Sequence, residues 1–331
     1  MKVCVIGGGT WGSAFALHLG TKNIQTNLWI REEDVYEQTL RYKENKTFLP
    51  GAVFPSSVSF FNNIKDAVQG AGLVFIAVPS KFCRSVYRQM APLLSEKTVL
   101  VSLTKGIEED SLLRMSQVME DVFSPHFAPK IAVLSGPSFA REVVESHPTA
   151  VVVASKDTSV SKTIQHHISN LSFRAYTSED ITGIEIAGAL KNVIAIASGI
   201  SEGLQFGANS MAALVTRGLA EMTRLGIKLG ARPETFAGLA GVGDLVLTCT
   251  GRLSRNRYVG YELGKGRQLE EIVKGMKMIA EGITTTLSGW QLAQKNKTDM
   301  PICEEIFHIL YKGKDPRSSL QNLMSRKLKE E

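Results

Sequence analysis

A glycine-rich turn near the N-terminus constrains the fold of this chain more than any other feature. Gly7-Gly8-Gly9-Thr10-Trp11-Gly12 contains the pattern G-x-G-x-x-G, follows the apolar run Lys2–Ile6 and opens the helix-like stretch Ser13–Leu19. In such a unit Gly7 permits the tight turn, Gly9 lets a pyrophosphate approach the backbone, and Gly12 lets helix and strand pack closely. The alternative is an ordinary strand–helix turn. The placement between strand and helix favours a dinucleotide site, with the free N–H groups of the helix N-terminus facing the phosphates.

Short apolar runs recur through the first half of the chain. They are nearly continuous, which is typical of strands that are covered on both faces. We expect strands at Val3–Ile6, Asn27–Ile30, Leu73–Val78, Thr98–Leu103, Ile131–Leu134, Ala150–Ala154 and Phe173–Tyr176. We expect helices at Ser13–Leu19, Lys81–Leu94, Ser111–Val122 and Ser159–Leu171. This alternation predicts an α/β domain of the Rossmann type with a mostly parallel sheet.

The second half of the chain shows no strand pattern. Helical stretches follow one another at Ile184–Ser198, Ala208–Leu225, Pro233–Leu239, Leu269–Gly275, Thr284–Lys295 and Pro301–Tyr311. We therefore expect two domains: residues 1–184 as the dinucleotide-binding domain and residues 185–331 as an all-α substrate-binding and catalytic domain. The charged tail Lys312–Glu331 is expected to be frayed or loosely docked.

Composition narrows the class of protein. The net charge is +6, and no block of five or six basic residues occurs, so an anionic small molecule is expected as ligand and nucleic acid is not. Four widely spaced cysteines lack metal-site or redox-pair spacing and suit the cytoplasm. The most membrane-like segment, Ile181–Ile200, contains Glu185 and Lys191, which favours a buried helix over integral membrane association.

The residues after the second expected strand bear on the cofactor. An acid there typically binds the ribose 2′-hydroxyl of NAD, whereas an arginine can bind the 2′-phosphate of NADP. Asn27–Ile30 is followed by Arg31 and then by Glu32. We expect NADP(H) to be preferred. The alternative is that Arg31 is solvated and Glu32 holds the ribose, which leaves use of NAD(H) open.

Lys191 stands in an apolar helical stretch. Its helical neighbours three and four residues away are Ala187, Gly188, Ile194 and Ala195, so its face is predicted to be buried. Burial lowers the pKa of a lysine and suits it to proton transfer. The alternatives are snorkelling at the helix end or pairing with Glu185, which lies on another face of the helix.

Two polar groups in the second half are candidates for substrate binding. Asp244 follows the glycine-rich segment Gly238–Gly243 and could orient a base, hold a substrate hydroxyl or act as a helix N-cap. Ser254-Arg255-Asn256 offers a hydroxyl, a guanidinium and an amide, which suits a phosphate group. A basic surface turn is the equal alternative for the second group.

Two loops follow expected strands at the ligand-binding edge of the sheet. Lys105 follows Thr98–Leu103, and Gly136-Pro137-Ser138 follows Ile131–Leu134. Taken singly, Lys105 would be a solvated charge and Ser138 a residue near a helix N-cap.

Together these segments identify a family. Gly7–Gly12, Thr104–Gly106, Ser135–Ala140, Ala189–Asn192, Gly241–Leu245, Ser254–Arg257 and Glu281-Gly282 occur in one order. In these segments the chain resembles the NAD(P)-dependent glycerol-3-phosphate dehydrogenases of the bacterial soluble type, over nearly its whole length.

The resemblance implies reversible reduction of dihydroxyacetone phosphate to sn-glycerol 3-phosphate, the backbone of glycerophospholipids, by a homodimer without a metal. It implies that Lys191 is the proton donor and that Lys105 and Asp244 assist it. The implied substrate contacts are Lys105, Gly136, Ser138, Lys191, Asp244, Ser254, Arg255 and Asn256. The implied cofactor contacts are Thr10 and Trp11 in the glycine loop and, beyond it, Arg31, Lys105, Ala140, Arg255, Ile279 and Glu281.

Two other functions remain as alternatives. A related two-domain dehydrogenase acting on another small anion would share the glycine loop but would not need the Ser254–Asn256 group. A non-enzymatic dinucleotide sensor would have no reason to bury Lys191.

Overall fold

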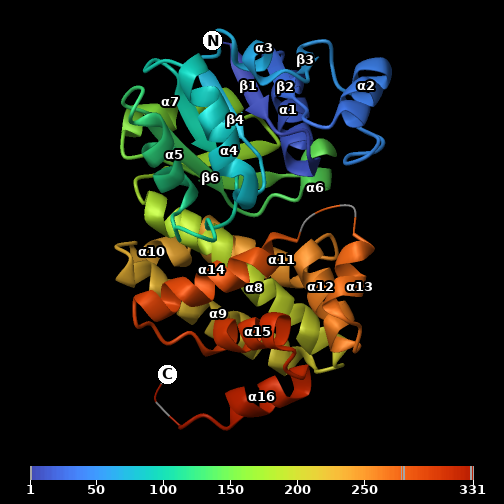
Figure 1. Cartoon of the computed structure of the whole chain (residues 1–331), viewed down its shortest axis with the longest axis vertical. Helices are drawn as coiled ribbons and strands as arrows, with labels where there is room; N and C mark the ends of the chain where they lie inside the picture. The colour runs from blue at the N-terminus through green and yellow to red at the C-terminus, as the bar shows by residue number, and fades with distance from the viewer. Residues whose placement is uncertain (1, 277, 279, 329, 331) are drawn as a thin grey trace. The chain divides into compact units, whose positions relative to one another are not determined.

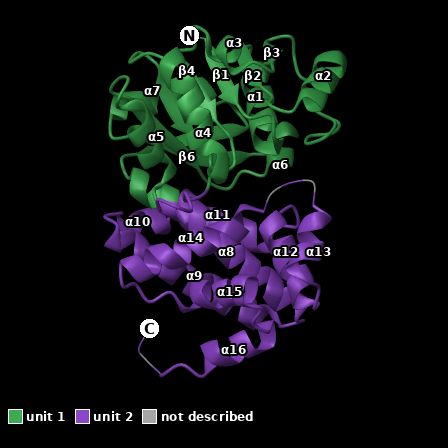
Figure 2. Cartoon of the chain, in the orientation of Figure 1, with its two compact units in different colours: residues 1–105, 113–185 green, residues 106–112, 186–331 purple. Residues whose placement is uncertain are grey.

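Figure 1 shows the computed structural model, which describes residues 2–276, 278, 280–328 and 330. They form two compact units, coloured green and purple in Figure 2. The first unit consists of Met1–Lys105 and Leu113–Glu185, and the second of Gly106–Leu112 and Ile186–Glu331. Residues 106–112 belong to the second unit, where Ile107 packs in the hydrophobic core. Nothing in the sequence pattern predicts this assignment.

The first unit is built on an eight-stranded sheet of order β3-β2-β1-β4-β5-β6-β7-β8. Its strands are β1 (Val3–Ile6), β2 (Thr26–Trp29), β3 (Val58–Phe61), β4 (Leu73–Ile76), β5 (Val99–Ser102), β6 (Lys130–Ser135), β7 (Thr149–Ala154) and β8 (Phe173–Ser178). Neighbouring strands are parallel except β6 and β7. Strand order reverses at β1, between β2 and β4. Open α/β sheets bind ligands beyond the carboxyl ends of their strands at such a point.

Helices cover both faces of this sheet. They are α1 (Thr10–Thr21), α2 (Glu33–Tyr42), α3 (Ile64–Val68), α4 (Ser80–Met90), α5 (Met115–Phe123), α6 (Ala140–Val144) and α7 (Thr158–Ile168), with a short 3-10 helix η1 (Ala91–Leu93). Alternate strand residues point to opposite faces. Val3 and Val5 therefore join the core that contains Phe15 of α1, whereas Cys4 and Ile6 join the core beneath α4 and α5.

The second unit is helical. Its helices are α8 (Ile181–Gly203, whose first turn belongs to the first unit), α9 (Ala208–Lys228), α10 (Pro233–Phe236), α11 (Asp244–Thr250), α12 (Arg255–Gly264), α13 (Leu269–Lys274), α14 (Glu281–Lys295), α15 (Pro301–Lys312) and α16 (Pro316–Met324), and a π-helical turn, η2 (Leu239–Gly243), precedes α11. Every strand named above ends before residue 179. The predicted fold class, a Rossmann-type domain with a mostly parallel sheet followed by an all-α region, is confirmed.

Helix α8 is the core of the second unit. It is long and apolar enough to cross a membrane, but its most apolar window is completely buried in the protein. A helix of a soluble core shows the same composition, so the prediction of a buried helix is confirmed.

The tail contains one helix. Residues 316–324 form α16, so this stretch is not frayed; Ser319 is the one buried residue of the helix, and loose docking stays a prediction. Asp315 caps this helix by accepting a hydrogen bond from Ser318 N at 2.9 Å, and Pro316 occupies its first turn. An acidic N-cap followed by proline is a strong helix-start signal.

Candidate active site

The glycine loop joins β1 to α1. Gly7 has φ +117°, and a Cβ atom there would lie 2.7 Å from the carbonyl oxygen of Ala77. A Cβ atom at Gly12 would lie 1.9 Å from the carbonyl oxygen of Gly7. Both positions therefore require glycine, one for the turn and one for helix–strand packing. Around Gly9, by contrast, no heavy atom lies within 4 Å of where a Cβ would be.

This loop fits the pyrophosphate of a dinucleotide. Helix α1 begins at Thr10 with no side-chain cap and no acidic residue in its first turn, so its N-terminal N–H groups can receive an anion. The indole N–H of Trp11 is buried and has no hydrogen-bond partner among the described residues. Such a donor is costly to leave unsatisfied, and a polar ligand group would satisfy it.

Arg31 lies just beyond β2. Its guanidinium is more than half exposed and binds Glu32 Oε1 through Nη2 at 2.7 Å and through Nε at 3.1 Å. A cation suited to a 2′-phosphate and a carboxylate suited to a 2′-hydroxyl therefore lie in contact.

The structure brings together Lys105, Gly136 and Ser138. Lys105 Nζ donates to the carbonyl oxygen of Gly136 at 2.9 Å, and Ser138 Oγ donates to the same oxygen at 3.0 Å. Gly136 has φ +136°, and a Cβ there would lie 2.9 Å from the backbone of Val151. Ser138 lies next to the N-cap of the following helix, as expected, because α6 begins at Ala140 and Phe139 occupies the cap position.

Lys191 is buried in the second unit, as predicted, with 6% of its surface exposed. Its Nζ donates to Asp244 Oδ1 at 2.6 Å and to Thr248 Oγ1 at 2.7 Å. Asp244 is itself 1% exposed, so a buried cation and a buried anion compensate each other. The alternative pairing with Glu185 is excluded as the local arrangement, because Glu185 binds Arg114 and Ser116.

The turn η2 sets the direction of Asp244. A Cβ at Gly241 would lie 2.1 Å from the carbonyl oxygen of Phe236, so the chain can turn tightly only with glycine there. Asp244 is the first residue of α11 and makes no side-chain cap, so the N-cap interpretation is wrong. Thr248, one turn later, donates its hydroxyl to the Asp244 carbonyl oxygen at 2.6 Å, which leaves its lone pairs facing Lys191.

Helix α12 packs against α8 through glycine. A Cβ at Gly260 would lie 2.0 Å from the carbonyl oxygen of Ile196, and one at Gly199 would lie 2.0 Å from that of Arg257. This close approach brings Asn256 against Asn192: Asn256 Nδ2 donates to Asn192 Oδ1 at 2.9 Å, and Asn256 Oδ1 accepts from Gly282 N at 2.9 Å.

The Ser254–Asn256 group is not a simple surface turn. Ser254 and Asn256 are buried, and Ser254 is the N-cap of α12, accepting from Arg257 N at 3.2 Å. Arg255 remains more than a third exposed. The protein around its guanidinium lowers the pKa of Arg255, and the Glu281 carboxylate opposes that shift. Glu281 begins α14, while Ile279 lies outside the described residues.

Two polar residues of this site were not predicted from the sequence. Asn192 directly follows Lys191, and Thr248 lies four residues after Asp244 on the same helix face. The i, i+4 spacing of Asp244 and Thr248 is the signal that would have found the second of them.

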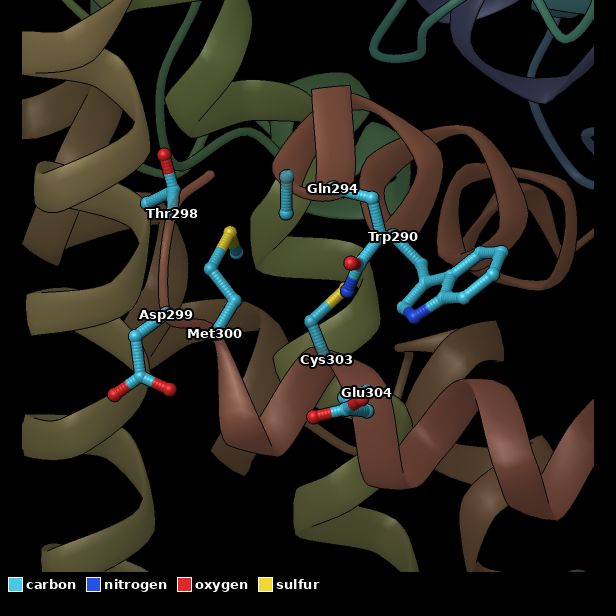
Figure 3. Close-up of a pocket in the computed structure, with 8 residues that line it drawn as sticks. Trp290, Gln294, Thr298, Asp299, Met300, Cys303 and Glu304 are labelled. Atoms are coloured by element: carbon cyan, nitrogen blue, oxygen red, sulfur yellow. The ribbon is translucent and has the colours of Figure 1, made fainter. Parts of the chain in front are cut away.

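A small pocket elsewhere in the second unit is a different feature. Figure 3 shows it between side chains of α14 and α15, among them Trp290 and Cys303. Its volume is about 80 Å³, and none of the predicted site residues lines it. It has room for a few water molecules and not for a nucleotide.

A doubly wound sheet with an open glycine loop, followed by a helical unit with a buried, acid-paired lysine, defines a two-unit protein of the Rossmann class. Family models named NAD-dependent glycerol-3-phosphate dehydrogenase N-terminus and C-terminus match residues 2–161 and 180–321. The chain belongs to the NAD-dependent glycerol-3-phosphate dehydrogenase family, and the resemblance found in the sequence is confirmed.

Individual relatives match over the full length. Glycerol-3-phosphate dehydrogenase (NAD(P)+) of Koribacter versatilis is 49% identical over 327 residues, covering 98% of this chain and 97% of the relative. The enzyme of the same name from Geobacter sulfurreducens is 48% identical over 330 residues, covering 100% and 98%. The crystal structure of glycerol-3-phosphate dehydrogenase from Coxiella burnetii has a TM-score of 0.95 at 38% identity, covering 98% and 99%.

Proposed function

We propose that this chain is an NAD(P)+-dependent glycerol-3-phosphate dehydrogenase. It reduces dihydroxyacetone phosphate reversibly to sn-glycerol 3-phosphate and so supplies the backbone of glycerophospholipids. The observation that carries this proposal is the buried Lys191 ammonium held by Asp244 and Thr248, in a chain whose two halves both match the family.

When bound, the reduced nicotinamide supplies the hydride for the carbonyl carbon. Lys191 then donates a proton from Nζ to the developing alkoxide oxygen, and it accepts that proton back in the oxidation direction. Asp244 holds the ammonium and keeps its charge compensated in a buried setting. Thr248 fixes the direction of Nζ, because its hydroxyl proton is committed to the Asp244 carbonyl.

The remaining polar residues bind the substrate phosphate and hydroxyl groups. Arg255 offers a planar guanidinium fork that matches phosphate, with Ser254 and Asn256 beside it in sequence. Lys105 contributes a positive charge, and Gly136 and Ser138 a backbone and a hydroxyl group. Asn192 positions Asn256 through the amide–amide hydrogen bond.

The cofactor is NADP(H), and NAD(H) is used as well. Gly7, Gly9, Thr10, Trp11 and Gly12 hold the pyrophosphate. Arg31 binds the adenosine ribose, and Lys105, Ala140, Arg255, Ile279 and Glu281 complete the cofactor contacts. We assign the enzyme to the cytoplasm, because all four cysteines are free and buried, and to a homodimer by analogy with the family.

The test is cofactor oxidation by the purified chain, followed by the absorbance of the reduced nicotinamide, with dihydroxyacetone phosphate as substrate. Rapid oxidation is expected with NADPH and slower oxidation with NADH. Unphosphorylated dihydroxyacetone is the control and is expected to react poorly. Equal turnover of both ketones would indicate a related dehydrogenase with another substrate. Tight NADPH binding without turnover of either would indicate a dinucleotide sensor.

A further inference from the structure

A phenyl ring in the first unit has two cations over it, Arg31, already described, and Lys81. The ring belongs to Phe82, in the first turn of α4. The Arg31 guanidinium carbon lies 5.1 Å from the centre of this ring, and Lys81 Nζ lies 4.7 Å from it. The two cationic groups are therefore at most about 10 Å apart.

The topology places this cluster at the cofactor edge of the sheet. Strand β1 pairs in parallel with β2 on one side and with β4 on the other, so the three strands end at the same edge. The glycine loop follows β1, Arg31 follows β2, and Lys81 and Phe82 follow β4. In Rossmann folds the adenosine end of a dinucleotide lies beyond the second strand.

NADP(H) and NAD(H) differ in charge at the 2′ position of the adenosine ribose. NADP(H) carries a 2′-phosphate where NAD(H) carries a neutral hydroxyl. Arg31 alone does not give the cluster a net positive charge, because Glu32 pairs with it at 2.7 Å. Lys81 is exposed, and for it the described part of the chain records only the contact with the Phe82 ring. Its charge therefore makes the cluster positive overall.

We propose that Lys81 is a specificity-determining residue for NADP(H): its ammonium, beside Arg31 on the Phe82 ring, binds the 2′-phosphate. Glu32 serves NADH instead, by accepting a hydrogen bond from the 2′-hydroxyl. The inference rests on the proposed use of NADP(H) by this chain. It explains how one site accepts both cofactors while distinguishing between them.

The test compares Lys81→Ala with two matched variants. Lys97→Ala removes the same charge from an exposed lysine that precedes β5 and therefore lies at the opposite, amino edge of the sheet. Lys81→Arg keeps the charge at the site. For each protein, the dissociation constants of NADPH and NADH are measured by fluorescence titration, and kcat/KM is measured for both cofactors with dihydroxyacetone phosphate.

Lys81→Ala is expected to weaken NADPH binding about tenfold and NADH binding less than twofold. Lys81→Arg should restore the NADPH preference, and Lys97→Ala should leave both constants unchanged. An equal loss for both cofactors, or no loss, would overturn the proposal. The binding ratio is read without turnover, so a chain that binds NADPH but does not reduce the ketone would refute the proposed function and still decide the role of Lys81.

Discussion

At the scale of single residues, a substitution at Lys191 is expected to impair catalysis without impairing cofactor binding. Lys191→Ala is expected to lower kcat by a hundredfold or more, the usual effect of losing a general acid, while the dissociation constant of NADPH stays unchanged. The substitution also leaves the Asp244 carboxylate buried without its cation, which costs about 3–5 kcal/mol. The double variant Lys191→Met with Asp244→Asn removes both charges, so it should recover most of that stability and remain inactive. Near-normal turnover in a folded variant would contradict the assignment.

The glycine loop gives a second prediction at this scale. Gly12→Ala is expected to destabilise the protein by about 1–3 kcal/mol, because its Cβ would meet the backbone oxygen of Gly7. Gly9→Ala should destabilise the protein by less than Gly12→Ala, since a Cβ there has no heavy atom within 4 Å and only the glycine N-cap of α1 is lost. It should nevertheless weaken NADPH binding, because the methyl group would occupy the space that we propose for the pyrophosphate. Urea unfolding and NADPH titration on both variants measure the contrast; tight NADPH binding by Gly9→Ala would count against the site.

At the scale of helices and strands, predictability follows burial. The runs that became β1, β4 and α8 are buried over nearly their whole length, so their apolar pattern is unbroken. Helix α2 escaped prediction because only Val35 and Thr39 of its ten residues are buried. Strand β3 escaped because only Val58 and Phe60 of its four residues are buried, so no continuous apolar run marks it.

The packing of α9 against α15 predicts a pH dependence of stability. Glu221 on α9 is buried and accepts hydrogen bonds from Ile302 N at 2.7 Å and Cys303 N at 3.2 Å, in the first turn of α15. Burial raises the pKa of Glu221 from 4.5 to about 7, although these hydrogen bonds oppose the shift. The folded chain therefore binds this proton more tightly than the unfolded chain. Stability from this group is present below pH 4.5 and is lost as pH rises to about 7.

Glu221→Gln removes that titration. The free energy of unfolding of the unsubstituted chain should fall by about 3 kcal/mol more than that of Glu221→Gln between these two pH values. Urea titrations across the range measure the difference, with Glu270→Gln, at an exposed glutamate of the same unit, as the control. Parallel pH profiles for the unsubstituted chain and Glu221→Gln would show that Glu221 does not titrate there.

At the scale of the whole molecule, the order of the motifs along the sequence identified the family. The spacing of the residues could not show which of them contact one another. Lys191 and Asp244 are 53 residues apart, and Asn192 and Asn256 are 64 apart. No local periodicity in the sequence predicts such contacts. They arise because glycines let α8 and α12 approach closely and because the turn η2 directs Asp244 inward. The residue types of the site were therefore predictable, whereas the partner of each one was not.

The net charge of +6 predicts that association of the whole molecule with its anionic ligands depends on salt concentration. A positive chain attracts a phosphorylated ketone and a polyanionic cofactor over distances that salt screens. We expect kcat/KM to fall roughly threefold to tenfold between low and high KCl, and more steeply for NADPH than for NADH because the 2′-phosphate adds negative charge. Sucrose at equal osmolarity should have little effect, which separates screening from osmotic effects. Equal salt slopes for the two cofactors would mean that the 2′-phosphate meets no positive field, and the roles of both Arg31 and Lys81 would then have to be abandoned.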